Sequence, residues 1–538
     1  MALIQFRDLA QQGIIRDVPP HSLPLNAWSA GQNVRFHAGK AMRAPVLKTW
    51  ARLGRPALFS CAYRPASLED SIFFLGDDRR IYRASQAGDE NVAPENWTPP
   101  ASKLSPSSTS LGDVLYLNVP GAAPLFWGPE SKKFTPLPGW DKDWSCRSLR
   151  TFGNYIVALN VSKGGTRIPQ MFKWSDLTLA GQPPSSWDAN DPTTNAGENV
   201  LEGLSSPIID GLEMRHAFVV YASDQAYLVQ QINNEMIFSF QRLGINGGVI
   251  APNCVAEVNG VHYCFGTSDI YRHDGTSRES IADGRIRAHV FETLDRDATE
   301  NFFTLYDTIN GDVIFAYRSS SSDAVFQGKG CNQAAIFNIA SSTWSFIDLP
   351  NIVQGYVASL EQGQRYLDME KAGISFEMLF ATYLDLEGGH TPSIVFASST
   401  VPDMAPASRI LAYDFVDTGK QKNLAVEAVC NAPAWIERTG IDLDLQGADL
   451  ATYKQVLRVY PQASFARNPD TVRISVGGAL TPSGGDQWKP AVLFDPIKQY
   501  KVDVRTGGRY FSYRYQVDAL VDFELSGFDC DVASGGRR

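Results

Sequence analysis

Residues 26–45 read Asn-Ala-Trp-Ser-Ala-Gly-Gln-Asn-Val-Arg-Phe-His-Ala-Gly-Lys-Ala-Met-Arg-Ala-Pro, and the rest of the chain is best understood outward from this stretch. Asn33 to Phe36 predict a short strand, and Ala41 to Arg43 predict its return strand. Between them, Gly39 supplies the positive φ that a tight hairpin turn needs. Pro45 ends the pairing, because proline has no backbone N–H to donate. The stretch therefore predicts a β-hairpin that follows a proline-rich arm.

The far end of the chain, residues 507–538, carries two further strand patterns. Gly508 to Tyr515 form the first pattern, which is rich in aromatic residues. Val521 to Val532 continue it, and the chain closes on Gly535-Gly536-Arg537-Arg538. Both ends of the chain thus predict β-structure.

Taken together, the two ends resemble the podophage tail nozzle family, also known as tail tubular proteins. Leu23 to Pro45 match the family's hairpin pattern, N-V-R-F-x-x-G-K followed by proline. Residues 507–538 match its closing pattern, a G-R-Y strand, then W/F-x-L-S-G-x-D-x-D and a Gly-Arg-Arg end. Phe523 stands where many relatives have tryptophan. The resemblance implies a β-propeller in a structural protein of a short phage tail.

Length and composition favour several β-rich units. A chain of 538 residues is too long for one hydrophobic core, so two or more domains or a repeat architecture are expected. The 29 Phe, 20 Tyr, 11 Trp, 44 Gly and 31 Pro favour short strands and many turns over helices. No apolar run approaches the roughly 20 residues of a membrane helix, and residues 1–16 lack the apolar core of a secretory signal. We therefore expect a soluble protein that is synthesised in the host cytoplasm.

Pairs of short strands recur through the middle of the chain at a spacing of roughly 45 to 60 residues, which is typical of propeller blades. Asn310-Gly311, between two apolar strand patterns, is the strongest hairpin signal. Trp174-Ser175-Asp176 and Pro184-Ser185-Ser186-Trp187 match blade features of the family that the chain resembles. These patterns predict a β-propeller, and the available span together with the resemblance implies six blades. A pair of β-sandwiches would use the same short strands and stays an alternative.

The pattern of apolar and polar residues changes near Lys422. After it the two kinds of residue alternate with a period of two, as in Val456 to Tyr460 and Val472 to Val476. Such alternation predicts half-buried antiparallel strands. Helices are expected to be few and short, and the best candidates are Gly363 to Glu370 and Asp283 to Leu294. The predicted fold class is therefore all-β.

Three parts are expected from these patterns. Residues 1–50 form an N-terminal arm and hairpin that packs on the C-terminal β-domain. Residues 51–422 form the β-propeller, and residues 423–538 form a C-terminal β-sandwich-like platform domain.

Charge and cysteine usage exclude some classes of protein. A net charge of -10 and a pI near 5.3 argue against a protein that reads DNA sequence, because such a protein needs a basic face for phosphates. An acidic wall would let DNA pass without sticking, although modest acidity also simply keeps a large protein soluble. The seven cysteines are odd in number, scattered and without a CxxC pair, which favours reduced, buried thiols. Only Cys254 and Cys264 are spaced to pair across a predicted hairpin.

Common catalytic and metal-binding motifs do not occur in the sequence. It contains no sialidase-type Asp box, GxSxG elbow, Walker loop, HExxH or CxxC pair. Asp442 to Gly447 begin like a calcium loop, but Tyr453 stands where an EF-hand needs its bidentate Glu. This segment is therefore interpreted as a strand followed by a turn.

Isolated titratable residues receive structural interpretations. The histidines that stand out, His262, His273 and His289, are expected to be structural or surface residues. The carboxylate pairs Asp77/Asp78 and Asp529/Asp531 are expected to be solvated in turns or on one strand face. The sequence thus assigns no catalytic, cofactor-binding or metal-ligating residue, and no cofactor.

The resemblance implies a structural virion protein in the distal part of a short tail, without enzymatic activity. In this interpretation six copies form the nozzle ring, which retains the genome and forms the DNA ejection channel below the portal and adaptor. The expected partners are further copies, the tail adaptor protein, tail fibres or tailspikes, and genomic DNA that passes without sequence readout. The alternatives are a propeller docking scaffold and a glycan-binding or glycan-degrading tail component.

Overall fold

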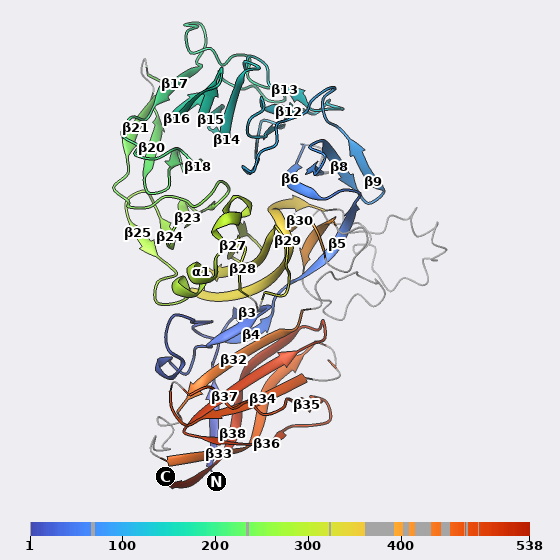
Figure 1. Cartoon of the computed structure of the whole chain (residues 1–538), viewed down its shortest axis with the longest axis vertical. Coiled ribbons are helices and arrows are strands. Elements are labelled where there is room, and N and C mark those ends of the chain that lie inside the picture. Colours follow the sequence, from blue (N-terminus) through green and yellow to red (C-terminus); the bar gives the residue numbers. More distant parts are fainter. Residues whose placement is uncertain are drawn as a thin grey trace.

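The structure is a computed structural model that describes residues 2–65, 70–232, 236–321, 324–360, 392–401, 408–414, 432–442, 452–466, 469, 472–482 and 484–537. These residues contain 38 strands, one α-helix and two 3-10 helices, so the chain is all-β as predicted. Figure 1 shows a closed circle of sheets, which we call the propeller, above two sheets that we call the sandwich. Both chain ends lie at the end of the sandwich farthest from the propeller.

Five of the propeller sheets are four-stranded and antiparallel, and each is built from four consecutive strands. The innermost strands β10, β14, β18, β22 and β26 contact one another in this order around the circle. The five sheets are β6–β9 (Ala57–Tyr63, Ser71–Gly76, Ile81–Ser85, Gly88–Asn91), β10–β13 (Ser107–Leu111, Val114–Asn118, Leu125–Trp127, Thr135–Pro136), β14–β17 (Trp144–Phe152, Tyr155–Lys163, Thr166–Trp174, Gly197–Val200), β18–β21 (Asp210–Met214, Ala217–Tyr221, Ala226–Gln231, Phe238–Arg242) and β22–β25 (Val255–Val258, Val261–Phe265, Ile270–His273, Arg278–Ser280).

The sixth sheet of the propeller has seven strands and closes the circle. Its long strand β29 pairs with β28 up to Ile352 and with β30 beyond it, and therefore belongs to two successive sets of four strands. The described strands thus form six hydrogen-bonded sheets but seven sets of four strands around the circle, one more than the six blades predicted, because the last two sets share β29. In sheet order the strands are β26 (Phe303–Asp307), β27 (Asp312–Tyr317), β28 (Cys331–Asn338), β29 (Thr343–Ser359), β30 (Pro392–Ser398), β31 (Ser408–Asp414) and β5 (Val46–Leu53).

Closure of the propeller joins distant parts of the chain. Strand β5 comes from the N-terminal region and pairs with β31, with Val46 opposite Asp414 and Leu53 opposite Ser408. Strand β29 also contacts β6, the first strand of the first sheet. The circle is therefore held by both ends of the propeller segment.

The sandwich combines C-terminal strands with the N-terminal arm and hairpin. The β38 sheet has the order β3 (Val34–His37), β4 (Lys40–Arg43), β38 (Phe523–Arg537), β33 (Thr452–Phe465), β36 (Val502–Gly508), and β1 (Ala2–Arg7) also pairs with β38. The β37 sheet has the order β2 (Ala30–Gln32), β32 (Ala434–Ile441), β37 (Tyr510–Val517), β34 (Val472–Ala479), β35 (Val492–Phe494).

The two sheets of the sandwich share an aromatic core. The ring of Phe528 on β38 stacks on that of Tyr513 on β37, with centroids 4.1 Å apart, and on that of Phe6 at 4.7 Å. The prediction that residues 521–532 continue the strand 508–515 is wrong. Strands β37 and β38 lie in opposite sheets, because the chain crosses between them after Val517.

Several sequence expectations concern short elements. The hairpin of β3 and β4 is confirmed, and Gly39 in its turn has a φ of 75°. Helix α1 (Arg287–Thr293) lies inside the predicted Asp283 to Leu294, and the 3-10 helices are η1 (Pro20–Ser22) and η2 (Arg296–Asn301). None of these three helices is long enough to span a membrane. The candidate helix at 363–370, residues 443–447 of the calcium-like loop and the domain boundary at 422/423 lie outside the described residues, and the boundary stays a prediction.

Gly13, in the arm before β2, approaches the backbone of β29 closely. Its φ is +65°, and a Cβ there would lie 2.8 Å from Thr343 Cβ and 2.9 Å from the Trp344 carbonyl oxygen. Gly13→Ala is expected to lower the free energy of unfolding by about 2–4 kcal/mol, through left-handed strain and overpacking. Gly164→Ala is the control, because Gly164 has a φ of +52° but no atom within 4 Å of a built Cβ. Urea denaturation that gave equal losses for both variants would contradict the close approach.

Candidate functional site

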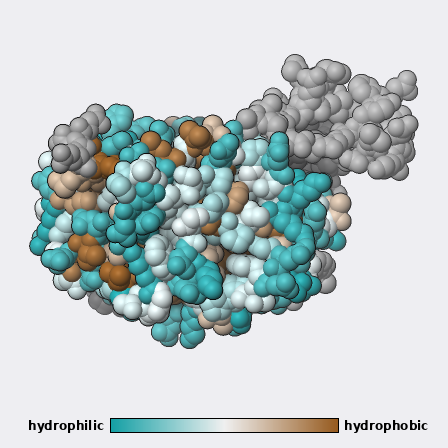
Figure 2. Space-filling view, turned by 90° about the horizontal axis from the view of Figure 1, so that it is seen from above, coloured by the Kyte–Doolittle hydropathy of each residue, from teal (hydrophilic) through white to brown (hydrophobic). Residues whose placement is uncertain are grey.

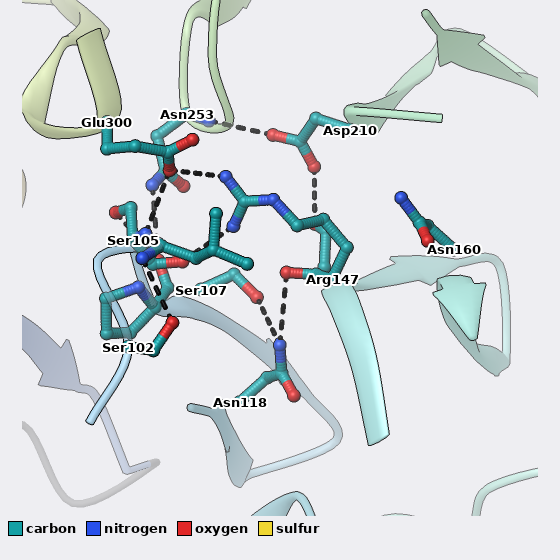
Figure 3. Close-up of polar contacts among 12 residues, drawn as sticks. Ser102, Ser105, Ser107, Asn118, Arg147, Asn160, Asp210, Asn253 and Glu300 are labelled. Atoms are coloured by element: carbon teal, nitrogen blue, oxygen red, sulfur yellow. Dashed lines mark hydrogen bonds and ion pairs between the residues drawn. The ribbon is translucent and has the colours of Figure 1, made fainter. Parts of the chain in front are cut away.

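A polar network crosses the inner edge of the propeller (Figure 3). Arg147 on β14 forms an ion pair with Glu300 of η2, and its Nη1 donates to the Ser105 carbonyl at 3.0 Å. The backbone N–H of Ser105 also donates to Glu300 Oε2, at 3.0 Å. These residues stand at or just before the inner strands β10, β14 and β26. The network thus joins strand sets that are not neighbours in the circle.

The second part of the network surrounds Asp210, the first residue of β18. Arg150 donates to Asp210 through Nε at 2.9 Å and through Nη2 at 2.6 Å, and its Nη2 also reaches Asn253 Oδ1 at 2.7 Å. Further donors to Asp210 are Ser148 Oγ at 2.5 Å and the Asn253 backbone N–H at 2.8 Å. Burial works to raise the pKa of Asp210, but Arg150 and the hydrogen-bond donors outweigh it and lower the pKa below its usual value. Asp210 is therefore a charged acceptor that binds the inner strands together.

This network bears on the enzyme alternative. A glycan-degrading propeller would place free carboxylates and aromatic platforms in a pocket at its mouth. Here Glu300 is bound by Arg147 and Asp210 by Arg150. The arrangement suits cross-linking of the strand sets better than proton transfer, because neither carboxylate is free for a substrate.

Two of the highlighted histidines meet inside the propeller, on neighbouring strands of the β22–β25 sheet. His262 Nδ1 lies 2.7 Å and His273 Nε2 lies 2.5 Å from the hydroxyl of Tyr221. The Gly275 backbone N–H donates to His273 Nδ1, so His273 carries its proton on Nε2 and donates to Tyr221. Tyr221 then donates to His262 Nδ1, and His262 Nε2 donates to the Glu213 carbonyl at 3.0 Å. The hydrogen bonds therefore all run in one direction, from His273 through Tyr221 and His262 to the Glu213 carbonyl. This order requires both imidazoles to be neutral.

Acid is expected to destabilise the fold through these histidines. Burial lowers the pKa of His262 to about 4. Burial also lowers the pKa of His273, to about 3, and the neighbouring His262 contributes to this shift. An unfolded histidine has a pKa of about 6.5, so stability is complete above that pH and is lost as pH falls toward about 4. His273→Gln keeps a donor for Tyr221 but does not titrate. We expect wild type to lose about 2 kcal/mol more than this variant between about pH 7.5 and about pH 5.

Urea denaturation at the two pH values measures this difference. Asp312, whose pKa burial raises to about 6, acts in the opposite direction, but it is present in both chains and cancels in the comparison. Equal pH dependence in wild type and His273→Gln would contradict the proton order described above.

The predicted hairpin forms the junction between propeller and sandwich. Asn33, which has a φ of +58°, donates from Nδ2 to Asp348 Oδ2 at 2.8 Å and to the Pro433 carbonyl at 3.1 Å. Its Oδ1 accepts from the Asp348 backbone N–H at 3.0 Å, and Gln32 donates to Asp348 Oδ1 at 2.8 Å. Burial raises the pKa of Asp348, and the amides of Asn33 and Gln32 work against this rise. Asn33 thereby ties β29 of the propeller to the start of β32.

Two arginines extend this junction in opposite directions. Arg35 on β3 donates to Asn310 in the β26–β27 turn of the propeller. Arg43 on β4 is buried in the sandwich, where it donates to the carbonyls of Ala519 at 2.9 Å and Ala432 at 3.1 Å. The β3–β4 hairpin is therefore a structural connector between propeller and sandwich. Its sequence pattern predicts the hairpin but not the roles of these side chains.

A groove of about 520 Å³ lies on the outer face of the β38 sheet. Its lining includes Asp529 and Asp531 of β38, Leu3 of β1 and Tyr500. The carboxylate of Asp529 accepts hydrogen bonds from Nη1 and Nη2 of Arg7, at 2.5 and 2.9 Å. The prediction that this carboxylate pair is solvated is wrong, because both side chains are buried in a network of cross-strand partners.

The remaining highlighted residues have structural surroundings. Asp77 and Asp78 are exposed in the β7–β8 turn, as predicted, and Asp78 also accepts a hydrogen bond from Tyr82. His289 packs edge-on against Phe346. The six cysteines in the described residues, Cys254 and Cys264 among them, are free and buried thiols. Within the same residues, no three His, Cys, Asp or Glu side chains gather as metal ligands would.

Comparison with known proteins finds similar structures but no similar sequences. No protein family model and no curated protein matches the chain. The WD40 β-propeller domain of Doa1 has a TM-score of 0.37 and 11% identity, over 70% of this chain and 99% of that one. YCF48 bound to D1 peptide has a TM-score of 0.34 and 10% identity, over 74% and 99%. At such scores these likenesses carry no argument about function, and the propeller assignment rests on the strand pairing itself.

Proposed function

We propose that this protein is a structural subunit of the nozzle ring of a short phage tail. One observation supports the proposal best: parts of the two stretches that resemble the family's signatures, the β3–β4 hairpin and strand β38, pair in one sheet, and β37 lies in the facing sheet of the same sandwich. Leu525 on β38 pairs with Ala41 on β4, and Lys40 binds Glu524 at 2.6 Å although these residues are 484 positions apart. Strand β1 pairs with the same β38. The resemblance thus concerns one structural unit rather than two unrelated matches.

The architecture suits a load-bearing part of a tail. A propeller cross-linked at its inner edge and tied to a sandwich by a buried hairpin transmits force without large deformation. In the proposed assembly six copies surround a lumen below the portal and adaptor, where they retain the genome and later let it pass. The net charge of -10 favours passage of DNA without binding, because like charges repel the phosphates. Tail fibres or tailspikes would attach to the outer surface.

Immunogold electron microscopy of tailed particles tests this proposal. An antibody against the full chain is applied to purified particles, and an antibody against the major capsid protein serves as the positive control. We expect gold at the distal end of a short tail. Particles that carry capsid label but no label from this antibody, while the lysate contains the protein, would overturn the proposal in favour of the scaffold or enzyme alternatives.

A further inference from the structure

The groove on the β38 sheet has the size and the lining of a site for a small ligand. Its volume of about 520 Å³ falls within the range of roughly 300–1,000 Å³ that is usual for ligand pockets. Figure 2 looks onto the propeller end, where hydrophobic side chains form small separate patches in a mainly hydrophilic or intermediate surface. The groove lies on the sandwich instead, and its lining combines aromatic, amide and carboxylate side chains. They are Tyr460, Tyr500, Gln462, Gln499, Asp529 and Asp531.

Two tyrosine rings provide an aromatic surface along the groove. The centroids of the Tyr460 and Tyr500 rings are 6.3 Å apart, and the ring planes are inclined by 32° to each other. The hydroxyl of Tyr460 donates to Asp531 at 2.9 Å, which fixes the position of this ring. Tyr500 is 74% exposed. Its ring is therefore available to stack on the apolar face of a ligand.

The charges of the two carboxylates in the groove are already compensated. Arg7 binds Asp529 with both Nη atoms, and Nη1 of Arg458 lies 3.4 Å from Oδ2 of Asp531. Because each carboxylate has a guanidinium partner, the groove does not call for a cationic ligand. An anionic ligand would meet the negative ends of these pairs. The groove therefore suits a ligand without net charge.

Asp531 keeps an open acceptor in spite of its partners. The side chain is nine-tenths buried, and the hydrogen bonds that it accepts from Tyr460 and Arg458 both end on Oδ2. Its Oδ1 has no hydrogen-bond partner among the residues that the structure describes, and it is not sealed off from solvent. A carboxylate oxygen carries two lone pairs, so Oδ1 is ready to accept hydrogen bonds from a ligand.

Two glutamine side chains add further hydrogen-bonding atoms. Gln462 donates from Nε2 to Asp529 at 3.1 Å, which leaves its Oε1 without a partner among the described residues. Gln499 accepts from the Asp495 backbone N–H through Oε1 at 3.0 Å, which leaves the donors of its Nε2 in the same situation. The groove thus presents two acceptors and one donor group beside an aromatic ring.

We propose that this groove binds a neutral oligosaccharide. A sugar ring has hydroxyl groups that donate to carboxylate and amide oxygens, and an apolar C–H face that packs on an aromatic ring. Oδ1 of Asp531 accepts from one hydroxyl, the open amide atoms of Gln462 and Gln499 bond to others, and the ring of Tyr500 covers the apolar face. The inference concerns binding alone, and it does not rest on the proposed function because it is drawn from the groove itself.

Glycan binding by the full chain tests the inference. The chain is applied to an array of bacterial surface polysaccharides and is titrated calorimetrically with cellohexaose, mannohexaose and the acidic hexagalacturonate. We expect at least one neutral glycan to bind saturably, with a Kd of about 10 μM to 1 mM, and hexagalacturonate not to bind. Tighter binding of the hexasaccharide than of its monosaccharide identifies a polysaccharide as the source of the ligand, and equal binding identifies a free sugar. Saturable binding by no neutral glycan, or a preference for the acidic one, overturns the inference.

Substitution of an exposed aromatic residue locates the binding in the groove. Tyr500→Ala removes the stacking ring and is expected to weaken binding of the glycan at least about tenfold. Trp488→Ala is the matched control, because Trp488 is also an exposed aromatic residue of the sandwich, 37% exposed, but does not line the groove. Equal affinities of Tyr500→Ala and wild type, or an equal loss in Trp488→Ala, would show that the groove is not the site.

A second substitution tests the open acceptor. In Asp531→Asn the remaining oxygen stays with Arg458, so an amide N–H₂ group replaces the acceptor Oδ1, and binding is expected to weaken at least about tenfold. Thermal unfolding checks that the variant is folded, and Tyr500→Ala decides the matter if it is not, because Tyr500 is exposed. Unchanged affinity in folded Asp531→Asn contradicts the role of this oxygen. Gold on the tail without glycan binding refutes this inference alone, and glycan binding by a protein absent from particles refutes the proposed function alone.

Discussion

Asn33→Ala is expected to lower the free energy of unfolding by about 3–5 kcal/mol, which is a large effect for one residue outside the hydrophobic core. The variant loses two side-chain donors and one acceptor, and Asp348 remains buried with fewer partners. Removal of a donor from a buried carboxylate costs about 1–3 kcal/mol, and alanine at a left-handed φ adds about 1–2 kcal/mol. The loss falls at the junction between propeller and sandwich.

Differential scanning calorimetry measures this effect and locates it. Asn96→Ala is the matched control, because Asn96 has a φ of +59° but is exposed in a turn, so only the backbone strain of about 1 kcal/mol remains. We further expect the heat absorption of Asn33→Ala to separate into two transitions, since the tie between β29 and β32 is cut. A single transition, with a loss no greater than that of Asn96→Ala, would contradict the junction role of Asn33.

Asp210→Ala has the second large expected effect, a destabilisation of about 3–5 kcal/mol. The substitution leaves the buried guanidinium of Arg150 without its bidentate partner, and Asn253 and Ser148 lose their acceptor as well. An unpaired buried charge is costly because the interior cannot replace the hydration that it lost. The consequence is a propeller whose inner strands are no longer held together.

Urea denaturation of two companion variants tests this explanation. Asp283→Ala removes an exposed pair with Arg287 and is expected to cost at most about 0.5 kcal/mol. The double variant Asp210→Ala with Arg150→Met removes both buried charges and is expected to regain part of the lost stability. If the double variant is as unstable as the sum of its single substitutions, the unpaired charge is not the cause.

Local patterns predicted local pairing well. The Asn310-Gly311 signal gives the turn between β26 and β27, and the hairpin of β3 and β4 forms where the sequence places it. Trp187, singled out as a blade feature, is fully buried against Trp140, with ring centroids 4.8 Å apart. These successes share a cause: the turn residues and the period of two act within a few residues of one another.

Distant pairing could not be predicted in the same way. Nothing in the sequence of β5 indicates that it pairs with β31. Strand β29 likewise belongs to two sets of strands, because its pairing partner changes from β28 to β30 at Ile352. The sequence also gave no sign of the Arg147–Glu300 pair, which joins positions 153 residues apart. Such contacts depend on how whole sheets are placed, which periodicity does not encode.

The junction illustrates a site that was partly predictable. The hairpin and its resemblance to a family were visible, whereas the role of Asn33 depends on Asp348, which no local pattern links to it. The burial of Asp529 and Asp531 was missed for a similar reason. Their partners Arg7, Arg458, Tyr460 and Gln462 come from two other strands.

Electron cryomicroscopy of the virion tail tests the central claim most directly. A reconstruction that resolves side chains identifies each protein of the tail and its copy number. The account predicts a ring of six copies of this chain in the distal part of a short tail, around a lumen wide enough for DNA. A resolved tail whose distal ring is built from another chain, with this protein absent from every component, would contradict it.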